Sequence, residues 1–167
     1  MKNFTNTITK RIIAKAETTG FDKLSYFNVP DKNHRNYWVS DEKTGLTHIL
    51  LQDLTINTVD TDTYIDEKFN EACWYNDLST NTKRKGKHGY VTTNVYTNGK
   101  NRQIRQTKVI TNTAGLGHRV EVDHLNGNTY DNRRINLSAG SHKSNANNLY
   151  PYKYKEVPAI VYPWDHE

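Results

Sequence analysis

The chain contains one cysteine, four prolines and few apolar residues among its 167 positions. The lone cysteine, Cys73, excludes a disulfide within the chain and any cysteine-based zinc site. Hydrophobic residues make up 34% of the sequence, below the roughly 45–50% usual for globular chains. We therefore expect a thin core in which aromatic rings supply much of the buried area, because each ring buries a large surface.

Long apolar runs are missing as well. None approaches the ~20 residues that cross a membrane, and residues 1–6 pass straight into polar sequence rather than into a secretory signal. The sequence therefore predicts an intracellular, cytoplasmic protein with no membrane partner.

Acidic residues are absent from one long stretch. From Asn81 to Arg119 the chain has nine basic residues and no acid, whereas from Asp41 to Asp77 nine acids outnumber two lysines. Such a stretch is the electrostatic footprint expected of a protein that binds a polyanion, although a solvated basic face is the commoner explanation of a single charge run. The nine basic residues are Lys83, Arg84, Lys85, Lys87, Lys100, Arg102, Arg105, Lys108 and Arg119.

The first half of the chain shows both helical and strand patterns. Apolar residues at helical spacing predict a helix over residues 5–18, and they are Ile8, Ile12, Ile13 and Ala16. The further elements expected here are strands over Ser25–Val29, Tyr37–Ser40 and Thr47–Leu51, a polar loop over Thr55–Thr63 and a helix over Tyr64–Trp74. We expect the three tryptophans, Trp38, Trp74 and Trp164, to belong to the core.

The second half is dominated by strand patterns. Tyr90–Tyr96 and Gln103–Thr111 have strand character, and Asn98-Gly99 between them is the strongest short hairpin signal. Arg119–His124 alternates apolar and polar residues and predicts a half-buried strand. The tail from Tyr150 to Glu167 holds three of the four prolines and is too proline-rich for regular structure.

One segment after the basic stretch carries the residues suited to chemistry. A strand delivers Asp123 and His124 at its end, and a turn containing Gly127 follows. After the returning strand, Ser141 is a suitable N-cap for a helix that carries Asn145. The predicted unit is therefore β-β-α. Because adjacent residues on a strand point to opposite sides, Asp123 and His124 need a twist or bulge to face one phosphate together.

The expected helix is unusually rich in asparagine. Asn145, Asn147 and Asn148 are poor helix formers, which favours a functional reason for Asn145. Its carboxamide oxygen is a hard ligand that suits Mg²⁺ or Mn²⁺, and Asp123 supplies the matching carboxylate.

These residues resemble the core of the HNH, or ββα-metal, endonuclease family, especially its phage and homing-type members. The intervals also suit that family, with twelve positions from His124 to Asn136 and nine from Asn136 to Asn145. The residues that carry the resemblance are Asp123-His124, Gly127-Asn128, Asp131-Asn132, Asn136-Leu137 and Asn145.

The resemblance implies a role for each residue. His124 is the general base, Asn136 ties the loop to the strand and fixes the geometry of His124, and Asp123 and Asn145 hold one divalent metal ion, Mg²⁺ or Mn²⁺. It implies an α+β fold, in which a small antiparallel basic sheet and an N-terminal extension precede a ββα-metal (His-Me finger) core. The implied reaction is hydrolysis of double-stranded DNA to 5′-phosphate and 3′-hydroxyl ends, by a phage homing-type enzyme in a bacterial host.

The resemblance also suggests how the chain is organised. We expect an accessory region over residues 1–60, a nuclease domain over 61–149 with its core motif at 119–149, and a tail over 150–167. Arg133 and Arg134 join the nine basic residues as expected DNA contacts. Two positions depart from the family pattern, since Gln106-Thr107 stands where relatives often carry His-Arg, and Ser138 stands where they tend to have Arg.

Two other functions stay open. A DNA-binding protein could keep the ββα shape without cleaving, although the unbroken set of Asp123, His124 and Asn145 argues against it. An RNA binder that uses the tyrosine-rich sheet is the weaker alternative, because the tyrosines are dispersed rather than clustered on one strand. His118 and His142 are lesser candidates for a catalytic role.

Overall fold

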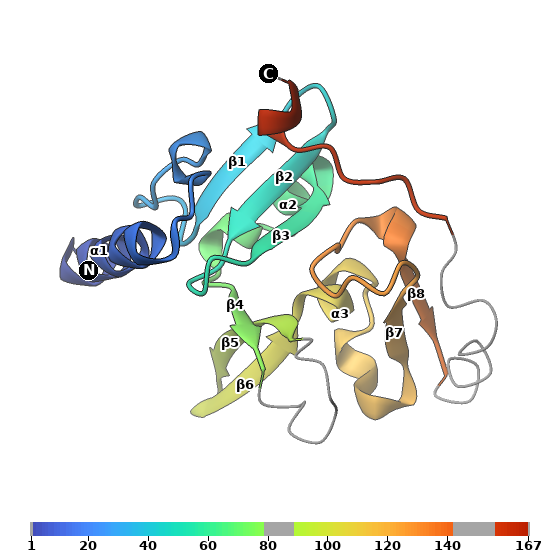
Figure 1. The fold of residues 1–167 in the computed structure, drawn as a ribbon. Helices are drawn as coiled ribbons and strands as arrows, with labels where there is room; N and C mark the ends of the chain where they lie inside the picture. The colour runs from blue at the N-terminus through green and yellow to red at the C-terminus, as the bar shows by residue number, and fades with distance from the viewer. Residues whose placement is uncertain (1, 79–88, 142–155, 167) are drawn as a thin grey trace. The chain divides into compact units, whose positions relative to one another are not determined.

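The computed structural model describes residues 2–78, 89–141 and 156–166 (Figure 1). The chain divides into two compact units. Unit 1 comprises Met1–Asn76 and Ile160–Glu167, and unit 2 comprises Asp77–Ala159. This division differs from the expected one, because the first boundary follows Asn76 rather than residue 60 and the end of the tail belongs to unit 1.

Unit 1 is built around a three-stranded antiparallel sheet of order β1-β2-β3 (Figure 1). Its register pairs Tyr37 with Leu50 and Leu46 with Asp60. In chain order the described elements of unit 1 are α1 (Lys2–Thr19), η1 (Leu24–Tyr26), β1 (Tyr37–Asp41), β2 (Leu46–Leu50), β3 (Ile56–Asp60), α2 (Thr61–Asp66), η2 (Phe69–Glu71) and η6 (Pro163–His166).

The core of unit 1 contains side chains of α1 and of the sheet. Every residue of β2 is buried, because β2 is the central strand. On α1, Ile12 is 3% exposed whereas Ile13 is 40% exposed. Neighbouring helical residues lie about 100° apart around the axis, so Ile13 does not share the buried side of the helix with Ile8, Ile12 and Ala16. The buried cluster consists of Ile8, Ile12, Phe27, Tyr37 and Leu50.

The three tryptophans lie in unit 1. Trp74 is buried, which confirms the prediction for this residue. Trp164, near the end of the chain, packs against the core with its ring 5.4 Å from that of Tyr26. Trp38 is half-buried and stacks on the His34 ring at 3.6 Å, so it lies at the edge of the core rather than within it.

Three predictions for unit 1 are wrong in part. Thr55–Thr63 forms β3 and the start of α2 rather than a loop. Ser25–Val29 holds most of η1 and one isolated bridge rather than a strand. The helix expected over Tyr64–Trp74 stops at Asp66, because Lys68 has left-handed backbone with a φ of 53°.

Unit 2 holds a hairpin, a short helix and a second strand pair (Figure 1). The hairpin strands β5 and β6 belong to a sheet of order β4-β5-β6, and β7 pairs with β8. The elements are β4 (Tyr75–Asp77) at the unit boundary, then β5 (Tyr90–Thr97), β6 (Lys100–Arg105), α3 (Gln106–Ile110), η4 (Ala114–Arg119), β7 (Glu121–His124), η5 (Arg134–Asn136) and β8 (Leu137–Gly140).

The hairpin turn is the one that the sequence predicts. Thr97 pairs with Lys100, so the turn has two residues. Asn98 and Gly99 have φ values of 51° and 73°, the positive values that a type I′ turn requires at both positions. The second strand ends at Arg105 and α3 follows, so the strand expected over Gln103–Thr111 is correct only in its first residues.

The described chain is thus a mixed fold of small antiparallel sheets and short helices, compatible with the α+β class. Within the described ranges, no helix is both long and apolar enough to cross a membrane. The helix expected after Ser141, which carries Asn145, lies outside the described residues. So do Lys83, Arg84, Lys85, Lys87 and His142.

Candidate active site

The pairing of β7 with β8 positions the two residues expected to carry the chemistry. The antiparallel register sets Asp123 opposite Ser138 and His124 opposite Leu137. The pairing runs through both residues without the expected bulge, so their side chains point to opposite faces of β7. His124 is only 4% exposed, whereas Asp123 is half-buried.

A tight turn follows β7. The Gly127 amide donates to the His124 carbonyl at 2.9 Å, and the φ of Gly127 is 75°, in the left-handed region that favours glycine. The Leu125 amide donates to the Asn136 carbonyl at 2.8 Å, which extends the strand pairing by one bond. The chain therefore reverses direction directly after His124.

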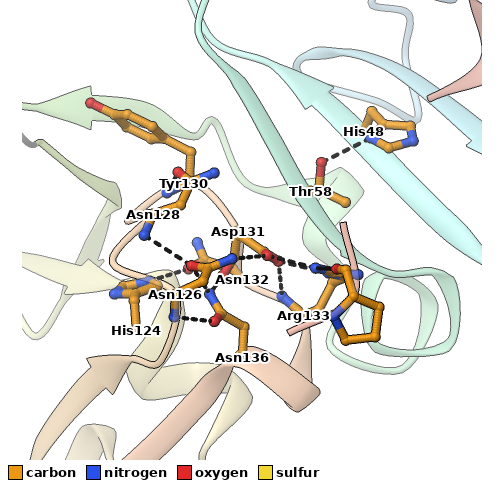
Figure 2. Close-up of polar contacts among 11 residues, drawn as sticks. His48, Thr58, His124, Asn126, Asn128, Tyr130, Asp131, Asn132, Arg133 and Asn136 are labelled. Carbon is orange, nitrogen blue, oxygen red and sulfur yellow. Dashed lines mark hydrogen bonds and ion pairs between the residues drawn. The ribbon is translucent and has the colours of Figure 1, made fainter. Parts of the chain in front are cut away.

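Asn136 is buried at the base of this turn (Figure 2). Its Nδ2 donates to Asn126 Oδ1 and to the Asp131 carbonyl, both at 2.8 Å. Its Oδ1 accepts from the Asn126 amide at 2.9 Å. Both donor hydrogens and the acceptor of this neutral side chain can be used in these bonds. Asn136 thereby ties the loop to the strand pair.

A buried ion pair also holds the turn (Figure 2). Arg133 donates through Nε to Asp131 Oδ1 at 2.8 Å and through Nη2 to Asp131 Oδ2 at 2.7 Å. Asn126 Nδ2 donates to the same Oδ2 at 2.8 Å, and Arg133 Nη2 also donates to the Pro158 carbonyl at 2.6 Å. The sequence predicts that Arg133 contacts DNA, but Arg133 is 6% exposed and its guanidinium is bound to these partners. It stabilises the turn instead.

His124 is held by two amide side chains in series. Its Nε2–H donates to Asn132 Oδ1 at 2.7 Å (Figure 2), and Asn132 Nδ2 donates to Gln106 Oε1 at 3.0 Å. Both amide residues are buried. An amide oxygen can only accept, so the proton of the neutral imidazole lies on Nε2 and the lone pair lies on Nδ1.

Burial determines the charge of His124. Removal of the ring from water lowers the pKa of His124 below its ordinary value. The hydrogen bond with Asn132 and the charges of Asp123 and Asp131 offset only part of that effect. The imidazole is therefore neutral at pH 7, the state in which Nδ1 can accept a proton.

Two side chains of the hairpin lie near His124. The ring of Tyr90 is 6.5 Å from the ring of His124, centre to centre. The guanidinium carbon of Arg105 lies 4.0 Å from the centre of the Tyr90 ring, which is a cation–π geometry. In addition, Gly89 donates its amide hydrogen to Tyr130 Oη at 3.1 Å. The hairpin and the turn therefore meet beside His124.

Comparisons of the chain with protein-family models, with curated proteins and with solved structures found no match. The family resemblance of the motif therefore stays a prediction, and any function has to be argued from the geometry of the site.

The expected metal site is described only in part. Asp123 is described, whereas Asn145 lies outside the described residues. Across residues 2–78, 89–141 and 156–166, no three His, Cys, Asp or Glu side chains gather in a way that could hold a metal ion. The Asp123 carboxylate and an Asn carboxamide are hard oxygen donors, which fit Mg²⁺ or Mn²⁺.

The other expected DNA contacts differ in exposure. Lys108 donates through Nζ to the carbonyls of Gly117 and Val120, so it holds the loop before β7. Arg105 is half-buried on the Tyr90 ring. Among the members that the structure describes, the exposed ones are Lys100, Arg102, Arg119 and Arg134.

Sequence reasoning missed how two amide residues act in the site. In the sequence, Gln106 is notable only because it stands where the family often has a His-Arg pair, and no local pattern indicates that its side chain reaches Asn132. For Asn126, which forms hydrogen bonds with both Asn136 and Asp131, one sequence feature indicates such a role. Asn126 belongs to an Asn-Gly-Asn sequence, and asparagines in turns often bond nearby backbone groups.

Proposed function

We propose that this chain is a divalent-metal-dependent DNA endonuclease of the HNH type, with a ββα-metal core that includes β7 and β8. Its reaction is hydrolysis of double-stranded DNA to 5′-phosphate and 3′-hydroxyl ends, in the manner of a phage homing-type enzyme. The observation that carries the proposal is the His124 imidazole, which stands at the end of β7 with its tautomer fixed by Asn132.

His124 acts as the general base in this proposal. Its Nδ1 takes a proton from a water molecule while the water oxygen attacks phosphorus and the bond from phosphorus to the 3′-oxygen breaks, so that the 3′-oxygen leaves and takes up a proton from solvent. The fixed tautomer means that the ring needs no rearrangement before it accepts the proton. Asn132 Oδ1 keeps its hydrogen bond to Nε2–H and stabilises the imidazolium that forms, and Asn136 keeps the strand end in place.

Asp123 and Asn145 are the residues that would hold the cation. When bound, the metal supplies Lewis-acid stabilisation of charge on the phosphoryl oxygens and the leaving group. Asp123 and His124 point to opposite faces of β7. One phosphate can meet both side chains only at the end of the strand, so the proposal places the scissile phosphate there.

One observation favours a second function. His124 is 4% exposed, although a general base has to reach a water molecule. A DNA-binding protein that keeps the ββα shape without cleavage would retain the series of His124, Asn132 and Gln106 as a structural element. The two functions differ in whether DNA is cut, so one assay separates them.

Plasmid cleavage is that assay. With Mg²⁺ or Mn²⁺ the purified protein should convert supercoiled plasmid to nicked or linear DNA, and EDTA should abolish the conversion. His124→Ala should lower the rate about 10²- to 10⁴-fold, the usual contribution of a general base. The exposed His118 provides the matched control, since His118→Ala should leave the rate unchanged. Cleavage that survives in EDTA or in His124→Ala contradicts the proposal, and binding without cleavage favours the second function.

A further inference from the structure

The outer half of the β5–β6 hairpin is exposed on both faces. Every residue from Asn94 to Gln103 is exposed, and Tyr96 is 76% exposed. An antiparallel sheet in a soluble protein commonly packs one face on a core, and an isolated two-stranded hairpin is marginally stable. A ribbon that extends beyond its core with both faces exposed is therefore expected to bind a partner.

The register divides the exposed side chains between two faces of different chemistry. Cross-strand partners share a face, and successive residues alternate between faces. One face, here the amide face, holds the pair Asn94 and Gln103 and the pair Tyr96 and Asn101. The opposite face, here the cationic face, holds Val95 with Arg102 and Thr97 with Lys100.

The amide face lies on the same side of β5 as Tyr90, which is next to the candidate active site, and the buried Thr92 separates the two. Tyr90 and Thr92 precede Asn94 at even spacing on β5, so they lie on the same face. Thr92 pairs with Arg105, whose guanidinium covers the Tyr90 ring. The Tyr90 ring is in turn 6.5 Å from the His124 ring. A ligand bound at His124 that extends along the hairpin would therefore meet the amide face.

We propose that the amide face reads base edges in the major groove of double-stranded DNA beside the cut; this rests on the proposed nuclease function. A two-stranded ribbon fits the major groove, and Asn and Gln amides can form paired hydrogen bonds with adenine N6 and N7. Charge supports the same partner, because Lys100 and Arg102 lie on the opposite face and no acid occurs from Asn81 to Arg119. On that face they point away from the base edges, and their long side chains would have to reach the phosphates beside the groove, which position the protein without reading sequence.

The strand geometry sets the distance between the cut and the recognised bases. A strand advances about 3.3 Å per residue, so Asn94 lies about 13 Å and Tyr96 about 20 Å along β5 from Tyr90. Duplex DNA advances about 3.4 Å per base pair. The preferred bases should therefore lie about four to six base pairs from the cut, on one side only.

Sequencing of cleavage ends from a randomised duplex library, with Mg²⁺ present, tests the proposal. The wild type should show a base preference about four to six pairs to one side of the cut. Asn101→Ala and Gln103→Ala should weaken that preference roughly 5- to 150-fold, the discrimination of one paired contact. Thr97→Ala, on the cationic face, should leave the preference unchanged. Lys100→Ala and Arg102→Ala should slow cleavage of all sequences alike.

A selection by binding separates this proposal from the nuclease proposal. Duplexes selected by binding to the His124→Ala protein should show the same base preference, whether or not the wild type cuts DNA. Lack of cleavage with preserved selection contradicts only the nuclease function. A flat preference in this window, or one that the amide substitutions leave unchanged, overturns the role of the amide face. Equal competition by single-stranded RNA of the same sequence also overturns it.

Discussion

The ion pair between Asp131 and Arg133 makes the turn after β7 sensitive to single substitutions. Its two side chains are 0% and 7% exposed, and they share two hydrogen bonds of 2.7 and 2.8 Å. Asp131→Asn leaves the guanidinium buried without a counter-charge, and Arg133→Met leaves the carboxylate in the same state. Breaking a buried pair from one side costs about 3–5 kcal/mol.

The double variant should be no less stable than the worse single variant. With both charges removed, no uncompensated charge is buried, so the two losses do not add. We expect a coupling free energy near the upper end of the usual range, about 3 kcal/mol. Arg134→Met is the matched control, because Arg134 is the exposed neighbour and surface substitutions usually change stability by about 0.5 kcal/mol or less.

Amide hydrogen exchange is the suitable measurement. The tryptophans lie in unit 1, so their fluorescence does not report on this turn. The Leu125 amide, bonded to the Asn136 carbonyl, does report on it. If this amide exchanges through unfolding of unit 2, a loss of 3–5 kcal/mol speeds exchange by about two to three and a half orders of magnitude. Simple additivity of the two single variants would refute the argument, as would single losses no larger than that of Arg134→Met.

Three further predictions concern the site and the core. In metal-free protein the His124 ring should titrate below pH 6.5 by NMR, since burial lowers its pKa. Asn132→Asp should raise the pKa of His124. An unchanged titration in that variant would exclude direct contact between residue 132 and the His124 ring. Asn136→Ala should destabilise unit 2 by about 2–4 kcal/mol, because three hydrogen bonds are lost and their partners on Asp131 and Asn126 stay buried or half-buried. Exchange at Leu125 measures this loss as well. Ile12→Ala should cost about 2–5 kcal/mol in urea unfolding; Ile13→Ala, at an exposed site, should cost far less, and equal losses would contradict the packing of α1.

The pH dependence of stability follows from the same histidine. The folded state favours the neutral imidazole, so the unfolded chain binds the proton first as pH falls. The contribution of His124 is therefore complete above about pH 6.5, its unfolded pKa, and is lost as pH falls through its lower folded pKa. Thermal unfolding of His124→Gln should show a weaker decline over that interval than the wild type.

Elements that depend on neighbouring residues could be predicted from the sequence, whereas elements that depend on distant contacts could not. The hairpin follows from Asn98-Gly99, because the turn needs positive φ at two successive residues. β3 was missed because its residues are polar, yet Asn57 and Thr58 are fully buried, and Thr58 Oγ1 lies 2.9 Å from His48 Nδ1. A polar segment is a strand here because distant partners satisfy its side chains. Composition alone carries no information on such partners.

In the candidate site, too, features set by neighbouring residues could be predicted and features set by distant contacts could not. The motif located the end of β7, the glycine turn and the central place of Asn136, because these depend on neighbouring residues. The contact between Asn132 and Gln106 joins positions 26 residues apart, and no periodicity predicts it. Arg133 resembles a surface cation in the sequence, and only its bonds to Asp131 and Pro158 show that it is internal.

Uncharged amides dominate the hydrogen bonding around His124, and this has a consequence for work at different ionic strengths. Bonds among Asn126, Asn132, Asn136 and Gln106 offer no net charge for mobile ions to screen, and the one ion pair of the turn is buried. Exposed charges such as Lys100 and Arg102 are screened over about 8 Å at physiological ionic strength. For the proposed nuclease, added salt should therefore release the DNA and leave the geometry around His124 intact, so inhibition by salt should reverse fully on dilution.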